Sequence, residues 1–257
     1  MNLQEIARHI DYHQKNGIEM EKVTLNYPSL KVDDAYEIQK ICIDEAGSRG
    51  ERLVGWKMGL TSAAKQKMVG VNEAIYGRLT SVMEMDSPEL SMKGLIHPKV
   101  EPELAFILKK DLKGDRVQPR DVWLATECIV PAVEVIDSRY KNFSFTLEDV
   151  VADNASSTKF LLGNQAFSPY HTEWDKLKVT ISRNNELQHE GYGRDVLAHP
   201  VRSVAELVRM LSKEGIGLKE GMVILTGGVT EAVNVQEGDT IRVDYENLGT
   251  LDMTVTE

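Results

Sequence analysis

Cysteine is scarce in this chain, and its scarcity limits the kinds of site that the chain can build. Cys42 and Cys128 are the two cysteines among 257 residues. Neither has the spacing of a zinc site or histidine-rich surroundings, and each falls in a segment with the pattern of a helix or a strand. We therefore interpret both as buried thiols. A catalytic cysteine is the alternative.

Long hydrophobic runs and an excess of positive charge are also lacking. No apolar stretch approaches the roughly 20 residues that a membrane span requires, and the first five residues lack the basic and apolar regions of a signal peptide. We therefore expect a cytoplasmic protein that does not enter a membrane. The 40 acidic and 30 basic residues leave a formal charge of −10. This balance disfavours a nucleic-acid backbone, itself negative, as the main partner.

The chain does have enough apolar material for a full core. With 257 residues and 42% hydrophobic content, it can form one large domain or a domain with a small appendage. Apolar residues recur at helical spacing through most of the first fifty residues, and from Leu53 the pattern changes to that of strands. We therefore expect a small, mainly helical segment over residues 1–52. A mixed sheet or β-roll core with peripheral helices should occupy residues 53–257.

Local signals place several elements of that core. Apolar residues alternate over residues 100–108, which predicts a strand, and Pro102 predicts that this strand lies at a sheet edge or a bulge. Asn184 and Asn185 predict the turn of a β-hairpin. Ser203 is placed to cap a helix that ends near Gly215.

Three glutamates are the strongest candidates for chemistry. Glu101 and Glu103 are two residues apart on a predicted strand, so both side chains leave the same face. Glu134 interrupts an apolar run, where a carboxylate is costly to bury without a partner. A hard divalent cation such as Mg²⁺ or Mn²⁺ would offset the repulsion among them and accept oxygen ligands. A solvated strand face is the alternative, and His97, a further possible ligand, is better explained as structural.

Other segments could contribute a substrate pocket. Lys57 lies in a short apolar run bounded by glycines, so its amino group should reach a wet cleft, a charged partner or the surface. Residues 153–158 carry small polar side chains that could grip a carboxylate or simply form a turn. Residues 226–230 contain two glycines that let backbone N–H groups approach a ligand. This stretch is too short and too loosely patterned for a phosphate loop, so we predict no nucleotide.

Taken together, five motifs resemble those of one enzyme family. They occur in this order: Gly55-x-Lys57-x-Gly59-Leu60-Thr61-Ser62, Pro98-x-x-Glu101-x-Glu103, Pro131-Ala132-x-Glu134, Val151-Ala152-Asp153-Asn154-Ala155-Ser156-Ser157 and Thr226-Gly227-Gly228. Their joint occurrence resembles the 2-oxopent-4-enoate hydratase and 4-oxalocrotonate decarboxylase family of the fumarylacetoacetate hydrolase superfamily. The resemblance is strong from about Leu53 onward and looser in the N-terminal helices.

The resemblance implies a fold, a metal and a site. The fold would be α+β, with the mixed β-roll or β-sandwich core of a fumarylacetoacetate hydrolase C-terminal domain and a small helical N-terminal part. Mg²⁺ or Mn²⁺ would bind at Glu101, Glu103 and Glu134, with Lys57 as the catalytic residue and no organic cofactor. The implied substrate-binding residues are Leu60, Thr61, Ile75, Ser156, Ser157, Thr226 and Gly227.

Within this family the alternatives are loss of carbon dioxide and addition of water. Hydratases usually carry an Asp in a Pro-Asp-Phe-Gly stretch, and this chain has Ile75 at that place. The stretches around Asp137-Ser138-Arg139 and Thr226-Gly227-Gly228 resemble the decarboxylase branch. We therefore expect decarboxylation of 2-oxohex-3-enedioate, a small unsaturated 2-oxo diacid, to 2-hydroxypenta-2,4-dienoate in the meta-cleavage degradation of aromatic compounds. A hydratase acting on that dienol is the alternative.

A non-catalytic partner of a hydratase is a further alternative, although such a protein would tolerate loss of one of the three carboxylates, and here all three are present. We also expect a homo-oligomer. A complex with the hydratase of the same pathway is plausible on chemical grounds, because the dienol product is reactive and is the substrate of that hydratase.

Overall fold

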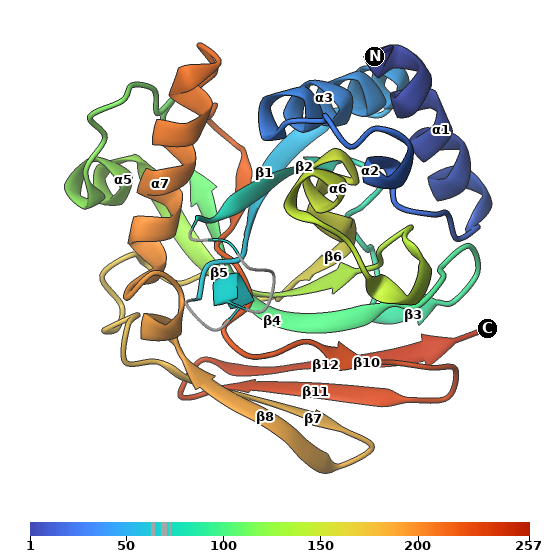
Figure 1. Ribbon diagram of the computed structural model, residues 1–257. Coiled ribbons are helices and arrows are strands. Elements are labelled where there is room, and N and C mark those ends of the chain that lie inside the picture. Colours follow the sequence, from blue (N-terminus) through green and yellow to red (C-terminus); the bar gives the residue numbers. More distant parts are fainter. Residues whose placement is uncertain (63–64, 68–70, 72) are drawn as a thin grey trace.

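Two β-sheets packed face to face form the centre of the molecule. The computed structural model describes residues 1–62, 65–67, 71 and 73–257. The first sheet has the strand order β2-β1-β9-β4-β5-β6, with β10 also paired to β4, and the second has the order β3-β12-β11-β7-β8. Figure 1 shows the second sheet as a layer beneath the strongly curled first sheet. The α+β fold predicted from the sequence is confirmed.

The strands are β1 (Leu53–Gly59), β2 (Ile75–Thr80), β3 (Glu89–Ser91), β4 (Lys99–Leu108), β5 (Thr126–Ile136), β6 (Ser157–Leu162), β7 (Lys178–Arg183), β8 (Glu186–Tyr192), β9 (Val223–Leu225), β10 (Val233–Asn234), β11 (Thr240–Tyr245) and β12 (Gly249–Thr256). The helices are α1 (Leu3–Asn16), α2 (Val23–Asn26), α3 (Val32–Ser48), α5 (Pro119–Ala125), α6 (Leu147–Ala152) and α7 (Pro200–Lys213), with short 3₁₀ turns at Lys141–Phe143, Asn154–Ser156 and Gly193–Asp195. Among the described residues, none of these helices combines the length and apolarity needed to cross a membrane.

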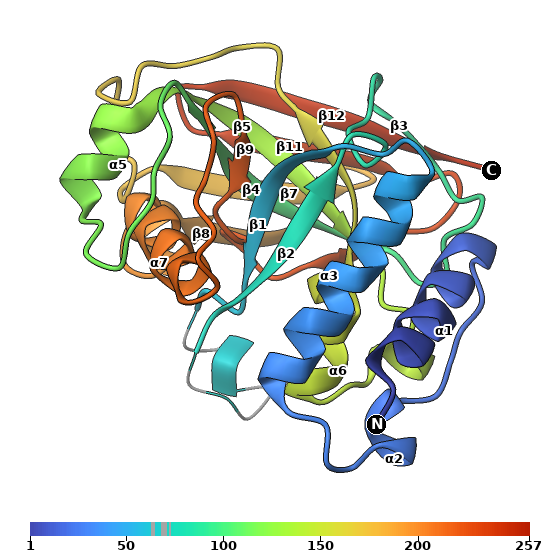
Figure 2. The same ribbon diagram turned by 90° about the horizontal axis from the view of Figure 1, so that it is seen from above.

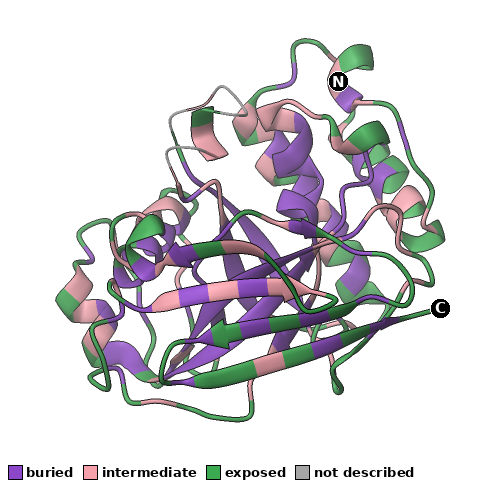
Figure 3. Ribbon diagram, turned by 90° about the horizontal axis from the view of Figure 1, so that it is seen from below, coloured by how far each residue is buried: buried purple, intermediate pink, exposed green. Residues whose placement is uncertain are grey.

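The alternation of side chains along β4 and β5 divides the first sheet into two faces. Leu104 and Phe106 of β4 pack with Val133 of β5 in the main core, which also includes Val243 of the second sheet. The intervening residues of both strands point into the curl of the first sheet, because side chains on a strand alternate between faces. Figure 3 shows the first sheet mostly buried, whereas β11 and β12 alternate between buried and exposed positions. The curled first sheet therefore encloses the polar side chains that its inner face carries.

The N-terminal helices cover one end of this enclosed face. Ile6 and Ile10 of α1 and Ile38 of α3 share a hydrophobic cluster with Val150 of α6 and with Ile75 of β2. Figure 2 shows α3 lying across α6 and β2, with α1 on its outer side. The helical character predicted for this part is confirmed. Because α3 shares a core with residues 75 and 150, we propose that the segment 1–52 folds together with the rest of the chain.

Three local predictions need correction. Pro102 was expected at a sheet edge or a bulge, but β4 is an interior strand. The backbone of Pro102 faces the gap between the segments of β4 that pair with β9 and with β10. There Val229 N donates to Pro102 O at 2.8 Å. No strand partner there needs the N–H that proline lacks. Ser203 does not cap α7, which begins after His199, and its hydroxyl instead donates to the Thr226 carbonyl at 2.6 Å. Cys128 is half-buried rather than buried.

The predicted hairpin turn is confirmed. Asn184 and Asn185 have φ of 54° and 66° between β7 and β8. Two consecutive residues in this left-handed region form the turn that matches the twist of paired strands.

Candidate active site

The pairing of β4 with β5 brings the three predicted glutamates together. Glu101 and Glu134 are direct partners across the two strands, and Glu103 lies two residues further along the same face. One carboxylate oxygen from each lies within 4.8 Å of the others. Glu103 and Glu134 are fully buried, and Glu101 is 9% exposed. We call these three glutamates with Lys57 the carboxylate centre.

The donors around these carboxylates are few and specific. Gly227 N donates to Glu103 Oε2 at 2.7 Å, and Ser157 Oγ donates to Glu134 Oε1 at 3.0 Å. Within the described residues, Glu103 Oε1 has no hydrogen-bond donor, and Glu134 Oε2 has none either beyond its ion pair with Lys57. A buried carboxylate oxygen without a donor is costly. The centre is therefore incomplete with protein groups alone.

Lys57 supplies positive charge from β1. Its Nζ lies 3.1 Å from Glu134 Oε2 and donates to the Ala155 carbonyl at 3.1 Å. Burial alone would lower the pKa of Lys57, but the field of the three glutamates outweighs it and raises that pKa. The side chain is therefore a fixed ammonium group inside the molecule, and the surface alternative considered for it is wrong.

Burial and mutual repulsion act in the opposite direction on the acids. The pKa of Glu103 is raised well above its usual range, first by burial and next by the charge of Glu134. The pKa of Glu134 is also raised by burial, with Lys57 opposing the shift. Metal-free ionisation of both groups is therefore unfavourable.

Lys65 also contacts the centre, and no motif or spacing in the sequence pointed to it. Its Nζ lies 3.1 Å from both carboxylate oxygens of Glu101. A divalent cation would compete with this ammonium group for Glu101, because both need the same oxygens.

Two glycines allow the backbone to lie directly against this centre. A Cβ at Gly228 would lie 2.2 Å from Glu101 Oε2, far inside contact distance. Gly227 has φ of +103°, and a Cβ there would lie 2.3 Å from the hydroxyl oxygen of Thr61. These positions exclude any other residue, so the glycine pair seen in the sequence has a physical reason.

A small pocket of about 80 Å³ opens beside the carboxylate centre. Its polar lining includes Lys57, Lys65, Glu101 and Ser156, whose Oγ is buried and has no hydrogen-bond partner within the described part of the chain. Its remaining lining is Gly59, Leu60, Ile75, Ile136, Phe143, Phe145, Val150, Ala155 and Gly228. A hollow of about 340 Å³ alongside α7 is larger but contains none of the three glutamates. Chemistry rather than size therefore locates the site.

The other predicted substrate residues have different places. Ser157 and Gly227 lie behind the glutamates and donate to them. Thr61 and Thr226 are buried and do not line the pocket, and within the described residues neither hydroxyl has a hydrogen-bond partner. His97 contacts Glu19 rather than the centre, with 3.4 Å between Nδ1 and Oε1.

The aromatic part of the pocket wall was not predicted from the sequence, although Leu60 and Ile75 of the same wall were. Phe143 and Phe145 belong to the stretch that resembles the decarboxylase branch, but no role was predicted for them. Asn142 and Phe143 have φ of 57° and 55°. Such irregular backbone has no periodic pattern that would place a side chain in a pocket.

The residues present fit a divalent cation. Three carboxylates converge, and no sulfur or imidazole lies among them. Among the described residues, Glu103 Oε1 lacks any hydrogen-bond donor, and Glu134 Oε2 has only the Lys57 ammonium group beside it. All-oxygen ligand sets of this kind suit Mg²⁺ or Mn²⁺.

Comparison with known proteins agrees with this fold. A family model described as "Fumarylacetoacetate (FAA) hydrolase C-terminal" matches residues 57–256. The chain belongs to this family. It is 41% identical over 244 residues to the 4-oxalocrotonate decarboxylase of Pseudomonas sp. (strain CF600), covering 95% of this chain and 92% of that protein. The family resemblance drawn from the motifs is therefore confirmed.

Two further relatives show the same kinship. The 2-hydroxyhexa-2,4-dienoate hydratase of Comamonas testosteroni is 38% identical over 238 residues, covering 91% of this chain and 90% of that protein. The solved structure of the 4-oxalocrotonate decarboxylase from Pseudomonas putida G7, complexed with magnesium and adipate, superposes with a TM-score of 0.96 at 39% identity. That match covers 98% of this chain and 97% of the other.

Proposed function

We propose that this protein decarboxylates 2-oxohex-3-enedioate (4-oxalocrotonate) to 2-hydroxypenta-2,4-dienoate with the help of a divalent cation. The observation that carries the proposal is a carboxylate centre beside a pocket that is otherwise lined mostly by apolar residues. Sequence and structural similarity to 4-oxalocrotonate decarboxylases supports the same reaction. No organic cofactor takes part in this scheme, because the conjugated keto group of the substrate itself accepts the electrons.

The electron flow follows from the substrate. The bond between C5 and C6 breaks, C6 leaves as carbon dioxide, and its electron pair forms a C4–C5 double bond. The C3–C4 double bond moves to C2–C3, and negative charge gathers on the C2 oxygen. Protonation of that oxygen gives 2-hydroxypenta-2,4-dienoate. Catalysis therefore requires positive charge near the C2 oxygen that acts more strongly as its charge develops.

The chain's own residues would meet this requirement. Mg²⁺ or Mn²⁺, held by Glu101, Glu103 and Glu134, would supply Lewis-acid stabilisation of the developing oxygen charge. Lys57, kept protonated by the glutamates, adds a fixed positive charge at the same centre. Ser156 Oγ, buried and without a partner in the described part of the chain, is free to orient a substrate carboxylate.

The apolar wall would favour loss of carbon dioxide over addition of water. Ile75, Phe143 and Phe145 line the pocket without offering a group that could deprotonate water. A carboxylate in such surroundings has less hydration to lose as neutral carbon dioxide forms. Ile75 occupies the place where related hydratases usually keep an Asp, so the same residue disfavours hydration.

One experiment separates the two reactions. Purified protein is given 2-oxohex-3-enedioate with Mg²⁺, and carbon dioxide release is measured before and after a chelator is added. A parallel sample receives 2-hydroxypenta-2,4-dienoate, and its dienol absorbance is followed. We expect chelator-sensitive carbon dioxide release and slow dienol consumption. Fast conversion of the dienol to 4-hydroxy-2-oxopentanoate, with no activity on the diacid, would assign the hydratase reaction instead. Similarity to a hydratase is the reason for testing that reaction.

The remaining sequence predictions belong to the same proposal. We propose a cytoplasmic homo-oligomer that associates with the hydratase of its pathway, because a reactive dienol is best passed directly to the next enzyme. Light scattering of the purified protein, alone and mixed with that hydratase, tests both associations.

A further inference from the structure

A strained turn lies between α6 and β6, next to the carboxylate centre. Asn154, Ala155 and Ser156 have φ of 53°, 53° and 59°, so three consecutive residues with side chains are left-handed. Left-handed backbone is unfavourable for residues with a Cβ, and such conformations persist only where their surroundings enforce them. The turn therefore needs support from outside itself.

The turn sets the position of groups in the site. Its Ala155 carbonyl accepts a hydrogen bond from Lys57 Nζ at 3.1 Å. The next residue after the turn, Ser157, donates to Glu134 Oε1 at 3.0 Å. Lys57 thus has two fixed partners, one carboxylate from β5 and one carbonyl from the turn. Movement of the turn would release one of them.

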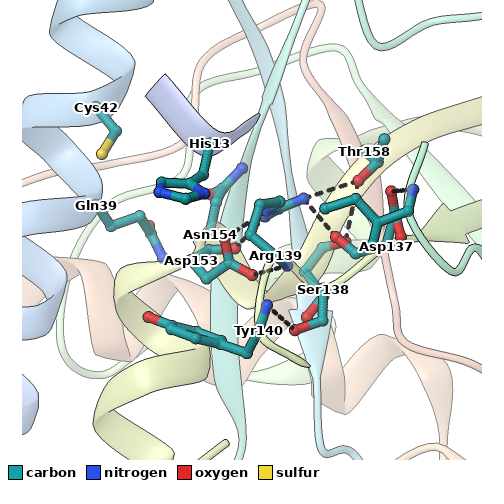
Figure 4. Close-up of polar contacts among 12 residues, drawn as sticks. His13, Gln39, Cys42, Asp137, Ser138, Arg139, Tyr140, Asp153, Asn154 and Thr158 are labelled. Atoms are coloured by element: carbon teal, nitrogen blue, oxygen red, sulfur yellow. Dashed lines mark hydrogen bonds and ion pairs between the residues drawn. The ribbon is translucent and has the colours of Figure 1, made fainter. Parts of the chain in front are cut away.

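Arg139 and Asp153 hold the start of the turn from within the protein. Both are almost completely buried, at 2% and 1% exposure. Arg139 donates from Nε to Asp153 Oδ1, from its backbone N to Asp153 Oδ2 at 3.1 Å, and from NH2 to the Asp153 carbonyl at 2.5 Å. It also donates from NH1 to the Asp137 carbonyl at 2.5 Å and to Thr158 Oγ1 at 3.0 Å. Figure 4 shows Arg139 between Asp137, Asp153 and Thr158; we call Asp137, Arg139 and Asp153 the Arg139 network.

Arg139 thus contacts residues on both sides of the turn, since Asp153 precedes the turn and Thr158 follows it. The first residue of the turn is fixed from β2, where Arg78 N donates to Asn154 Oδ1 at 2.7 Å and Asn154 Nδ2 donates to Arg78 O at 2.9 Å. A further bond runs from Asp137 N to the Ser156 carbonyl at 2.8 Å. None of the atoms of Arg139 and Asp153 in these bonds belongs to the pocket lining.

We propose that Arg139 and Asp153 are a positioning pair that enforces the left-handed turn and thereby fixes the amino group of Lys57 against the glutamates. The proposal rests on the proposed function for its kinetic readout, because Lys57 positioning matters for turnover of the diacid. The pair itself does not touch the substrate pocket. Its loss should lower kcat more than it changes KM, because a misplaced group near the reacting atoms costs rate even when binding survives.

The first test compares two isosteric changes of buried aspartates. Asp153→Asn removes the charge that holds Arg139. Asp149→Asn is the matched control, since Asp149 lies on α6, the helix that ends just before Asp153, is fully buried, and binds Thr24 and Thr146 rather than the turn. We expect Asp153→Asn to lower kcat about tenfold or more with KM changed less than about threefold, and Asp149→Asn to leave kcat within about twofold. Equal losses in both variants would overturn the proposal.

The second test asks whether strain in the turn is what the pair opposes. Glycine adopts positive φ without a Cβ penalty, so Ala155→Gly should hold the turn with less external support. We expect the loss of kcat caused by Asp153→Asn to be several times smaller in the Ala155→Gly background than in the natural one, a coupling that a double-mutant cycle measures. An identical loss in both backgrounds would show that the pair acts in some other way.

Hydrogen exchange of the holoprotein separates failure of this proposal from failure of the proposed function. Ser156 N donates to the Asp153 carbonyl at 3.0 Å. We expect exchange at the amides of residues 154–157 to accelerate at least about tenfold in Asp153→Asn and to be unchanged in Asp149→Asn, whichever reaction the protein catalyses. If Asp153→Asn does not fold, Arg139→Lys, which retains the charge but loses the planar fork of donors, carries the same expectations. Unchanged exchange in a folded variant would reject the positioning role.

Discussion

The carboxylate centre and the Arg139 network are both buried clusters of charge, yet they differ in how completely they are satisfied. In the network, Asp153 receives donors at both carboxylate oxygens from Arg139, and Asp137 receives Ile96 N and His97 N, each at 2.8 Å. In the carboxylate centre, Glu103 Oε1 lacks any donor among the described residues. The network is closed, whereas the centre leaves room for a ligand that brings positive charge.

Shifted ionisation alone does not separate the two clusters. Burial raises the pKa of Asp153 to about 6, with Arg139 opposing the shift. Burial also raises the pKa of Glu103. The difference lies in the donors, since a buried acid that is fully hydrogen-bonded is structural and one with free oxygens is poised for a cation. A raised pKa of a buried acid therefore indicates function only when the hydrogen-bond donors to that acid are also known.

The largest expected effect comes from breaking the carboxylate centre. We expect Glu103→Gln to lower turnover by at least about 1,000-fold, because removal of a metal ligand affects both binding of the cation and charge stabilisation. The same change should raise the melting temperature of the metal-free protein, since it removes repulsion with Glu134. Asp153→Asn should lower it, since Arg139 loses its partner. Calorimetry in the presence of a chelator measures both, and a lower melting temperature for Glu103→Gln would contradict the contrast between the clusters.

A smaller loss is expected from Lys57→Ala. The change removes the fixed ammonium group but leaves the three glutamates, so turnover should fall at least about tenfold while the fold is retained. Circular dichroism checks the fold, and steady-state kinetics with saturating Mg²⁺ checks turnover. Lys159→Ala is a suitable control because Lys159 is exposed at its amino group and contacts Val82 O rather than the centre. Turnover of Lys57→Ala near that of the natural protein would remove Lys57 from the mechanism.

The sequence was informative about the carboxylate centre for a physical reason. Alternation along a strand places Glu101 and Glu103 on one face, and the apolar residues around Glu134 indicate that it is buried. What could not be predicted from the residues alone is the register that makes Glu101 and Glu134 direct partners, because it depends on pairing between distant strands. The family motifs supplied that link.

The sequence was less informative about Phe143 and Lys65, which also line the pocket. Phe143 lies in irregular backbone with positive φ, and Lys65 reaches Glu101 from a segment with no periodic pattern. Neither position follows from spacing, because tertiary contacts set the conformation there. Helical spacing did predict α1 and α3. Their packing on α6 required the three-dimensional structure.

A change in the pocket wall should have a moderate effect. Ile75→Asp places a carboxylate where the wall is apolar and almost fully buried, at 3% exposure. It should lower carbon dioxide release about three- to tenfold, because the new side chain admits water and adds like charge near Glu101. Ile75→Val is the matched control, since it keeps the wall apolar and should retain most of the activity. Equal rates for Ile75→Asp and the natural protein would show that dryness at this position does not favour decarboxylation.

The smallest expected effect is a pH dependence that appears in one cluster and not in the other. Burial raises the pKa of Glu103 and of Glu134 above the usual 4.5, so folding of the metal-free protein favours their protonated forms. That stabilisation is fully present below pH 4.5 and is lost as pH rises through the raised folded values. A bound cation stabilises the ionised forms, so protons and Mg²⁺ compete for the same oxygens.

The increase in melting temperature caused by Mg²⁺ should therefore grow between pH 5 and pH 8 by about 2–4 °C for each kcal/mol of added binding energy. Glu103→Gln should flatten this dependence while Asp153→Asn leaves it in place, because the Arg139 network contributes no ligand to the cation. A Mg²⁺ effect that is equal at all pH values in the natural protein would mean that the buried glutamates are not the groups that release protons on binding.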